Sequence, residues 1–408
     1  MRLPFKTLDD IDLRNKRVLL RADINSSVDP RTKRISDDSR IVALVPTLRD
    51  LSRSKVVLIA HQGRPGSDDF ISLEQHAGII KNLGFRVSFV DDVYGESARR
   101  AIEQVNSGEV LVLQNVRYLD CEQKTGTPED MAKEPLVQEL YPLFDLFVND
   151  AFGAAHRGQP SIVGFAAVLP SVAGRIVERE YRILSEITQT DRHPWTLVLG
   201  GSKIADKTKT LARLMSTERV DHALIGGLMG NIFLAASGKI HEEHGSRIPD
   251  YEKVVSDVKM LLGKYEDKIV LPVDAVIDRN GKPTACNLKQ VGSDPILDIG
   301  PGTVELFSSK IRESVVVFAN GPMGYFEREE FSAGTYAVLD AIADFGGTSV
   351  VGGGHLGSLA ERRGIVHKIT HISTGGGATI EFLTGKKLQL IDALEKSAQT
   401  NWPAWRTN

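Results

Sequence analysis

Short, continuous apolar runs rich in β-branched residues recur along this chain of 408 residues, and they constrain its fold more than any other feature. Continuous runs are typical of strands buried on both faces, and helix-like segments separate most of them. Strand, helix and strand in repetition indicate parallel sheets built from βαβ units. The runs are residues 17–23, 55–61, 86–92, 109–115 and 146–150, then residues 196–201, 222–227, 268–274, 314–321, 348–353 and 370–376.

The number of these runs favours two domains. Eleven strands are unusual in one open sheet, and a chain of this length suits more than one hydrophobic core. Between the two series, residues 174–188 read as one long amphipathic helix, which would act as a stiff connector. A second amphipathic helix is expected at residues 388–397. The sequence therefore predicts an α/β protein with two parallel-sheet domains.

Composition excludes several classes of protein. The 50 Lys and Arg residues nearly balance 53 Asp and Glu residues, and the net charge of −3 disfavours a non-specific nucleic-acid binder. The two cysteines, Cys121 and Cys286, fit neither a disulfide scaffold nor the spacing of a zinc site. No apolar stretch resembles a secretory signal or reaches the roughly 20 residues that span a bilayer. We expect a cytoplasmic protein with no nucleic-acid or membrane partner.

Polar residues cluster where the strands of the first series end. Ligands of open parallel sheets bind beyond the carboxyl ends of the strands. The planar guanidinium of arginine suits carboxylate and phosphate groups. Solvated loop charges are the alternative for any one arginine, but five of them at strand ends favour an anion pocket. Its expected members are Arg21, Arg40, Arg64, Arg117, Arg157, His61 and His156.

The strands of the second series end in glycine instead. Glycine lets the backbone approach a ligand closely, and helix N-termini favour phosphate. Ordinary βα turns also use glycine, yet two triplets and several pairs in one half favour a nucleotide site. These glycines are Gly200, Gly201, Gly226, Gly227, Gly321, Gly352, Gly353, Gly354, Gly375, Gly376 and Gly377.

Two local motifs need separate assessment. Residues 201–208 nearly match a phosphate-binding P-loop, but Asp206 replaces the second glycine, so we reject that motif. Lys203 and Lys207 nevertheless fall on one face of the helix that follows, although solvated surface lysines remain an alternative. Residues 352–357 match the dinucleotide pattern GxGxxG, yet the next strand ends in no acidic residue, which disfavours a nicotinamide cofactor.

The sequence resembles the phosphoglycerate kinases through nearly the whole chain. Of the matching segments, NDAFGAAHR (149–157), NGPMGYFE (320–327) and STGGGA (373–378) are together highly specific, and His355 is similar to the archaeal branch of the family. The other matching segments are residues 21–25, 61–65, 115–118, 200–207, 271–276, 298–301 and 351–355.

The resemblance implies a particular domain organisation. Two Rossmann-like, doubly wound parallel-sheet domains would be joined by a hinge helix. Residues 1–172 would bind phosphoglycerate, residues 173–190 would form the hinge helix, and residues 191–374 would bind nucleotide. Residues 375–408 would return to the N-terminal domain.

The resemblance also implies a reaction. The chain would transfer a phosphoryl group reversibly between ATP and the carboxylate of 3-phosphoglycerate, giving ADP and 1,3-bisphosphoglycerate, with Mg²⁺ and domain closure. It would thus be a phosphotransferase with a carboxyl group as acceptor, acting as a monomer or small homo-oligomer.

Arg40, Lys203 and the amides of Gly375 and Gly376 would stabilise the transferring group. The implied phosphoglycerate ligands are Asp23, Asn25, Arg40, His61, Arg64, Arg117, His156 and Arg157. The implied nucleotide ligands are Gly201, Lys203, Lys207, Gly226, Gly227, Asn320, Glu327, Gly352, Gly353, Gly354, His355 and Leu356.

This reaction agrees with the residue types. The attacking carboxylate is already ionised at pH 7, so no general base is needed, and catalysis rests on positioning and positive charge. His355 and Leu356 stand where many members of the family have Asp-Thr; imidazole is a poor Mg²⁺ ligand, so no metal ligand is assigned. The alternatives are a non-catalytic nucleotide-binding scaffold of this family, a nicotinamide-dependent dehydrogenase and a phosphotransferase acting on another small acid.

Overall fold

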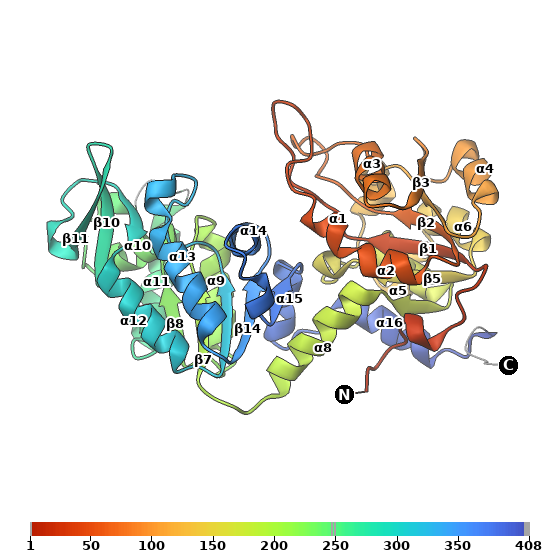
Figure 1. The fold of residues 1–408 in the computed structure, drawn as a ribbon. Helices are drawn as coiled ribbons and strands as arrows, with labels where there is room; N and C mark the ends of the chain where they lie inside the picture. Colours follow the sequence, from red (N-terminus) through yellow and green to blue (C-terminus); the bar gives the residue numbers. More distant parts are fainter. Residues whose placement is uncertain (1, 246–247, 249, 404–408) are drawn as a thin grey trace. The chain divides into compact units, whose positions relative to one another are not determined.

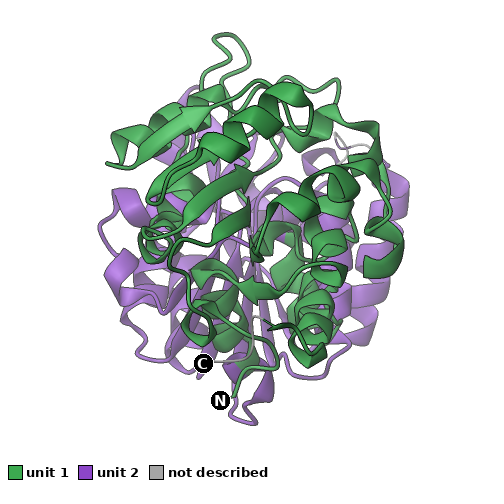
Figure 2. Ribbon diagram, turned by 90° about the vertical axis from the view of Figure 1, so that its right-hand side faces the viewer, with its two compact units in different colours: residues 1–185, 377–408 green, residues 186–376 purple. Residues whose placement is uncertain are grey.

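The computed structural model describes residues 2–245, 248 and 250–403, and it divides into two compact units (Figure 2). Unit 1 consists of Met1–Ser185 and Gly377–Asn408, so the segments leading to both ends of the chain belong to it. Unit 2 is Glu186–Gly376. Residues 404–408 of the predicted returning tail lie outside the described residues.

Unit 1 is built on a six-stranded parallel sheet with the strand order β3-β4-β2-β1-β5-β6 (Figure 1). Five of these strands fall in the apolar runs of the first series, whereas β6 was not predicted. The strands are β1 (Arg17–Ala22), β2 (Lys55–Ile59), β3 (Arg86–Phe89), β4 (Glu109–Val112), β5 (Leu146–Asp150) and β6 (Ser171–Ala173).

Both faces of this sheet are buried, as the continuous apolar runs predict. Along β1, Val18 and Leu20 belong to one hydrophobic cluster, while Leu19 belongs to the cluster on the opposite face. Val57 of β2 lies on the same side as Leu19. Because successive side chains of a strand alternate between faces, apolar residues in succession supply both clusters.

Helices cover the sheet of unit 1, and the C-terminal segment contributes two of them. Helix α16 packs against β6, where the backbone N–H of Ser171 donates to Oγ of Ser397 (3.0 Å). The α-helices are α1 (Ser39–Ala43), α2 (Val45–Asp50), α3 (Glu74–Asn82), α4 (Glu96–Gln104), α5 (Pro128–Met131), α6 (Pro135–Leu140), α7 (Pro160–Val163), α8 (Arg175–Gln189), α15 (Gly377–Leu383) and α16 (Gln389–Gln399). Helix α8 begins in unit 1, and its residues 186–189 belong to unit 2. The 3₁₀ turns are Leu8–Asp10, Val116–Tyr118, Asp120–Gln123, Tyr141–Leu143, Phe152–Ala154 and Gly164–Ala167.

Unit 2 contains a second six-stranded parallel sheet, in the order β15-β14-β13-β7-β8-β9. Five of the strands fall within apolar runs of the second series, and the sixth, at Trp195–Leu199, begins one residue before its run. The strands are β7 (Trp195–Leu199), β8 (His222–Ile225), β9 (Ile269–Val270), β13 (Val316–Asn320), β14 (Thr348–Gly352) and β15 (His371–Ser373). Together, the two parallel sheets confirm the predicted fold class of two Rossmann-like domains.

Unit 2 also carries a three-stranded antiparallel sheet that was not predicted. Its strands, in the order β11-β10-β12, are β10 (Asp274–Arg279), β11 (Lys282–Asn287) and β12 (Ile296–Ile299). The run at residues 268–274 is therefore not one strand: β9 ends at Val270 and β10 begins at Asp274. Pro272 lies between them, and proline cannot donate to a strand ladder.

Helices flank the parallel sheet of unit 2, and several begin where a strand and a glycine turn end. The α-helices are α9 (Ile204–Met215), α10 (Gly227–Ala236), α11 (Tyr251–Lys264), α12 (Pro301–Arg312), α13 (Ala333–Asp344) and α14 (His355–Arg362). The 3₁₀ turns are Glu242–His244, Leu288–Gln290, Glu329–Phe331 and Val366–Lys368.

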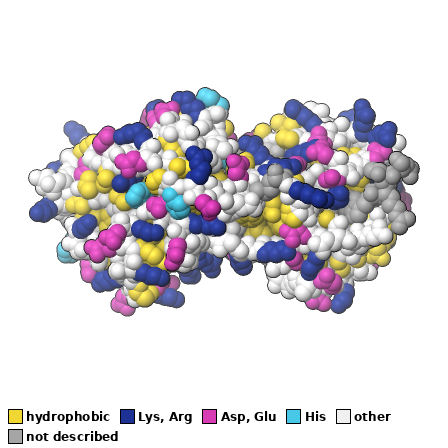
Figure 3. All heavy atoms as spheres, turned by 90° about the horizontal axis from the view of Figure 1, so that it is seen from below, with side chains coloured by type: hydrophobic (Ala, Val, Ile, Leu, Met, Phe, Trp, Pro, Cys, Tyr) yellow, Lys and Arg dark blue, Asp and Glu magenta, His cyan; other side chains and the backbone are white. Residues whose placement is uncertain are grey.

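The surface agrees with the near-neutral charge of the chain. On the face shown in Figure 3, acidic and basic side chains are interspersed. Among the described residues, no helix is both long enough and apolar enough to cross a membrane.

Candidate active site

The carboxyl edge of the sheet in unit 1 holds an ion pair between two predicted site residues. Asp23 directly follows β1, and Arg40 lies on the short helix α1. Nη1 of Arg40 donates to Oδ2 of Asp23 at 2.8 Å, and Asp23 is 7% exposed. The carboxylate thus holds one arginine at the edge where ligands of open parallel sheets bind.

Asn25 and Arg117 are joined through the turn that follows β2. Oδ1 of Asn25 accepts a hydrogen bond from the backbone N–H of Gly63 (2.8 Å), and Nη1 of Arg117 donates to the carbonyl oxygen of Gly63. Gly63 has a φ of +66°, and a Cβ there would lie 2.5 Å from the backbone nitrogen of Phe70. Only glycine fits, so the turn that gathers these side chains depends on it.

Arg21, Arg40, Arg64, Arg117 and Arg157 form what we call the arginine cluster. Burial and repulsion by Arg157 and Arg21 lower the pKa of Arg117 to about 10. Burial also lowers the pKa of Arg157, and Arg64 adds to this effect. The pKa of His61 lies well below 6.5, because the ring is buried and faces Arg21 and three other members of the cluster. Such mutual repulsion would be relieved by a bound anion.

Arg21 corrects one expectation. It was predicted to line the anion pocket, but its side chain is 0% exposed. Nε of Arg21 donates to Oγ of Ser161 (2.8 Å), and Nη2 lies 2.9 Å from Nδ1 of His61. The hydroxyl of Ser161 in turn binds Glu122, another buried residue, which sequence reasoning missed because nothing in the chain distinguishes it from a surface glutamate.

His156, Arg157 and Arg64 complete the predicted phosphoglycerate set. Nε of Arg157 lies 3.5 Å from Nε2 of His156, and both side chains are half-buried. Burial and the charge of Arg157 lower the pKa of His156. Arg64 is exposed, but its charge acts on both Arg117 and Arg157. The structure therefore brings the predicted residues of unit 1 together.

Lys203 and Lys207 occupy different environments in unit 2. Lys203 is the exposed N-cap residue of α9, and Lys207 follows one turn later. Nζ of Lys207 donates to both the backbone oxygen and Oδ1 of Asn320, each at 2.8 Å. Burial and the nearby Lys203 lower the pKa of Lys207 to about 8. Asn320 ends β13, so this contact joins two predicted nucleotide residues, one on helix α9 and one on a strand.

The glycines at the strand ends of unit 2 bring backbone segments close together. Gly227 has a φ of +60°, and a Cβ there would lie 2.6 Å from the nitrogen of Gly201 and 2.7 Å from the oxygen of Pro322. A Cβ at Gly353 would lie 2.6 Å from the carbonyl oxygen of Ser373. Side chains at these positions would separate the turns, so glycine is required where strands β7, β8, β13 and β14 end.

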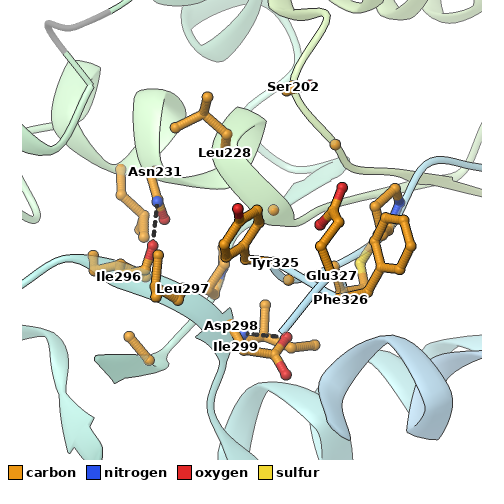
Figure 4. A pocket seen from close by; sticks show the side chains of 18 of the residues that line it. Ser202, Leu228, Asn231, Ile296, Leu297, Asp298, Ile299, Tyr325, Phe326 and Glu327 are labelled. Atoms are coloured by element: carbon orange, nitrogen blue, oxygen red, sulfur yellow. Dashed lines mark hydrogen bonds between the residues drawn. The ribbon is translucent and has the colours of Figure 1, made fainter. Parts of the chain in front are cut away.

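A pocket of about 330 Å³ lies in unit 2 (Figure 4). Four of the predicted nucleotide residues line it, namely Gly201, Gly227, Glu327 and His355. The rings of His355 and Phe326 are 5.1 Å apart between centroids. The other predicted residues lie outside its lining: Lys203, Lys207, Gly226, Asn320, Gly352, Gly353, Gly354 and Leu356.

Most residues of the pocket lining were not predicted, because they are apolar or neutral. In Figure 4, Tyr325 lies between Asn231 on one side and Glu327 on the other. Nδ2 of Asn231 donates to the oxygen of Ile296 (3.3 Å). Burial raises the pKa of Asp298, another lining residue, to about 7. Apolar walls with a few fixed polar groups are typical of sites for a flat, partly apolar ligand.

The remaining predicted residues belong to the glycine loops after β14 and β15. Gly354 has a φ of +74° and precedes α14, whereas the side chain of Leu356 is 4% exposed and packs in the core of unit 2. The N–H of Gly375 donates to Oγ of Ser373 (3.1 Å), and the neighbouring Gly376 is exposed. Any contact of Leu356 with a ligand would therefore be made by its backbone.

The described residues contain no cluster of three or more histidine, cysteine or acidic side chains that could hold a metal ion. Mg²⁺ is generally bound through substrate phosphates and one or two carboxylates, rather than by an all-protein cage. The described residues therefore single out no protein ligand for a metal ion.

Comparison with known proteins identifies the family. A family model described as "Phosphoglycerate kinase" matches residues 8–386. The chain belongs to the phosphoglycerate kinase family. The resemblance stated from the sequence is thereby confirmed, as is the predicted enzyme class, a phosphotransferase with a carboxyl group as acceptor.

Individual phosphoglycerate kinases match along nearly their whole length. The enzyme of Methanothermus fervidus is 43% identical over 399 residues, which cover 96% of this chain and 97% of that protein. That of Archaeoglobus fulgidus is 43% identical over 401 residues, covering 97% and 98%. The crystal structure of phosphoglycerate kinase from Pyrococcus horikoshii OT3 superposes with a TM-score of 0.89 at 37% identity, covering 96% of this chain and 99% of that one. The expected likeness to archaeal members is confirmed.

Proposed function

We propose that this chain transfers a phosphoryl group reversibly between ATP and the carboxylate of 3-phosphoglycerate, giving ADP and 1,3-bisphosphoglycerate. One observation carries the proposal: this member of the family has a different kind of site in each unit. Unit 1 contains the arginine cluster, and unit 2 contains a nucleotide-sized pocket beside two lysines. Each set of groups suits one of the two substrates.

Unit 1 would bind phosphoglycerate. Its ligands would be Asp23, Asn25, Arg40, His61, Arg64, Arg117, His156 and Arg157. The guanidinium groups would pair with the phosphate and carboxylate, since planar bidentate contacts suit both. Asp23, which pairs with Arg40, would accept from a hydroxyl group of the substrate, because an ionised carboxylate can only accept.

Unit 2 would bind the nucleotide. The apolar pocket around Leu228 and Tyr325 would hold the base, with Gly201, Gly226, Gly227 and Glu327 nearby. Lys203 and Lys207 at the start of α9 would contact the phosphates, as would the loop Gly352–Leu356 before α14. Lys203 and Lys207 bring positive charge to the start of α9, and the N-terminus of either helix favours bound phosphate.

The transfer itself would depend on charge and positioning. Arg40, Lys203 and the backbone N–H groups of Gly375 and Gly376 would stabilise the phosphoryl group in transit. Mg²⁺ bound to the nucleotide would neutralise phosphate charge. Because the two substrates are assigned to different units, the proposal includes domain closure during turnover, which would also exclude water.

A coupled assay tests this function. With 3-phosphoglycerate, ATP and Mg²⁺, formation of 1,3-bisphosphoglycerate is measured by its reductive removal in the presence of NADH and a coupling dehydrogenase. We expect turnover that depends on both substrates. If nucleotide binds but no product forms, the non-catalytic scaffold or another acid substrate becomes the better account.

A further inference from the structure

Two buried charges lie beside the proposed phosphoglycerate site without a role in the reaction. Arg21 and Glu122 both belong to unit 1 and are each 0% exposed. Burying a charge is unfavourable unless the group is paired and hydrogen-bonded. Their hydrogen bonds form a continuous chain that ends on His61, one of the proposed substrate ligands.

At one end of this chain, Glu122 orients Ser161. The backbone N–H of Ser161 donates to Oε2 of Glu122 (3.1 Å), and the hydroxyl donates to Oε1 (2.6 Å). Nε of Arg21 lies 2.8 Å from the same hydroxyl oxygen. A guanidinium can only donate, so the hydroxyl accepts from Arg21 and gives its own proton to the ionised form of Glu122, whose pKa is raised by burial and lowered by the charge of Arg21. With Glu122 ionised, each hydrogen bond among Glu122, Ser161 and Arg21 therefore has a defined donor and acceptor.

At the other end, Arg21 decides where the proton of His61 lies. Nη2 of Arg21 is 2.9 Å from Nδ1 of His61, and because Nη2 donates, Nδ1 must be the bare acceptor. Burial and the surrounding arginines hold the pKa of His61 well below 6.5, so the ring is neutral near pH 7. A neutral ring with a bare Nδ1 carries its proton on Nε2.

The Nε2–H group of His61 is available to a ligand. Among the described residues, the hydrogen bond seen to this ring is the one at Nδ1, and the charges that act on the ring are those of the arginine cluster. In this tautomer, Nε2 can donate to an anionic oxygen. In the other tautomer, its lone pair would repel that oxygen.

We propose that Glu122 and Ser161, acting through Arg21, are positioning residues that hold His61 in the Nε2–H tautomer needed to donate to a carboxylate or phosphate oxygen of the substrate. The identity of the substrate rests on the proposed function. The tautomer rests on the hydrogen bonds alone.

The experiment compares the wild type with Glu122→Gln and Ser161→Ala. Glutamine loses the charge and cannot accept both bonds from Ser161, while alanine removes only a hydroxyl. ¹⁵N NMR of protein labelled at histidine should show an unprotonated Nδ1 and a protonated Nε2 for His61 in the wild type at pH 7. In both variants we expect mixed tautomers and a KM for 3-phosphoglycerate raised about tenfold, the effect of one hydrogen bond to a charged group, with a much smaller change in kcat.

Two further variants serve as references. His61→Gln assigns the His61 signals by their disappearance. Asp150→Asn changes another fully buried carboxyl group of unit 1. Asp150 has no hydrogen bond to Glu122, Ser161, Arg21 or His61, so this substitution should leave the His61 signals unchanged.

Several outcomes overturn the inference. It fails if both variants keep the wild-type tautomer, or if they change KM without changing the tautomer, because the role is then merely structural. If Glu122→Gln does not fold, Ser161→Ala decides. If the wild type does not bind 3-phosphoglycerate, the proposed function is wrong. The ¹⁵N signals still test the tautomer of His61, because that measurement needs no substrate.

Discussion

At the scale of single residues, the two lysines at the start of α9 differ in their exposure and in their hydrogen bonds. Lys203 is exposed at the N-cap, whereas Lys207 is held by two hydrogen bonds to Asn320. An exposed ammonium group at the N-cap suits a charge that forms during transfer. A fixed ammonium group suits a ligand that is held throughout. The two substitutions should therefore affect different kinetic constants.

Lys203→Ala should lower kcat far more than it changes substrate affinity. We expect kcat to fall about 100-fold or more, the usual effect of removing one donor to a developing charge, with the KM for ATP changed less than about threefold. Steady-state kinetics in the coupled assay measure both. Lys209→Ala, which removes another exposed lysine of α9, is the matched control. Wild-type kcat in Lys203→Ala would contradict the assigned role.

Lys207 should make nucleotide binding depend on pH. Its pKa of about 8 means that the free protein loses this charge as the pH rises through 8. A bound phosphate favours the protonated form, so the affinity for ADP should fall above pH 8, by up to about tenfold per pH unit. Titration calorimetry between pH 6.5 and 9.5 measures this. In Lys207→Arg, which stays charged, the decline should disappear; a flat wild-type profile would refute the assignment.

At the scale of secondary structure, Asp150 joins the end of β5 to the start of α8. Oδ1 of Asp150 accepts from the backbone N–H groups of Ile176 (2.8 Å) and Val177 (3.1 Å), and Oδ2 accepts from the hydroxyl of Thr47 (2.5 Å). Burial nevertheless raises the pKa of Asp150 to about 6. The first turn of the helix that leads toward unit 2 thus rests on one buried carboxyl group.

This carboxyl group should give unit 1 a pH-dependent stability. Between pH 4 and 6 the folded state holds a proton on Asp150 that the unfolded state has lost, so its contribution to stability falls as the pH rises, by about 3 kcal/mol in total. Asp150→Asn removes the titration. The free energy of unfolding of the wild type minus that of the variant, from urea titrations, should therefore be larger at pH 4.5 than at pH 7. An equal difference at both pH values would contradict the shift.

Element prediction succeeded where both faces of a strand are buried. The run containing Val18 to Leu20 became β1 because these three apolar residues pack in the cores on the two faces of the sheet. The antiparallel sheet was not predicted, because β11 alternates between partly buried and exposed residues and so contains no apolar run. One signal could have found it: Asn280 and Gly281, both with positive φ, form the turn between β10 and β11.

The candidate site was predictable to the extent that its residues carry charge or belong to glycine clusters. Arg40 and Lys207 could be singled out because their side chains suit anions. Tyr325 and Asn231 could not, since neutral pocket walls have no signature in a single sequence. Glu122 was missed for a third reason: its role comes from burial next to Arg21, and burial is decided by tertiary packing.

At the scale of the whole molecule, the division into units does not follow the order of the chain. Unit 1 takes its last two helices from beyond unit 2, and α16 is anchored there by Ser397 and by the N–H of Leu390, which donates to the oxygen of Ala155 (3.0 Å). Strand β15, close by in sequence, belongs to unit 2. Strand β15 and helix α16 lie close together in the sequence but should therefore be stabilised by different substrates.

Each substrate alone should stabilise the unit that binds it. A ligand present at 100 times its dissociation constant stabilises the folded state by about 2.7 kcal/mol, which slows hydrogen exchange through unfolding about 100-fold. We expect 3-phosphoglycerate to slow exchange in β1 and α16, and ADP to slow it in β7 and β15, as measured by mass spectrometry of peptides. Helix α16 is the decisive reporter, because it follows β15 in the chain but shares the core of unit 1. If ADP alone protected α16 as strongly as β15, the assignment of the two substrates to separate units would be wrong.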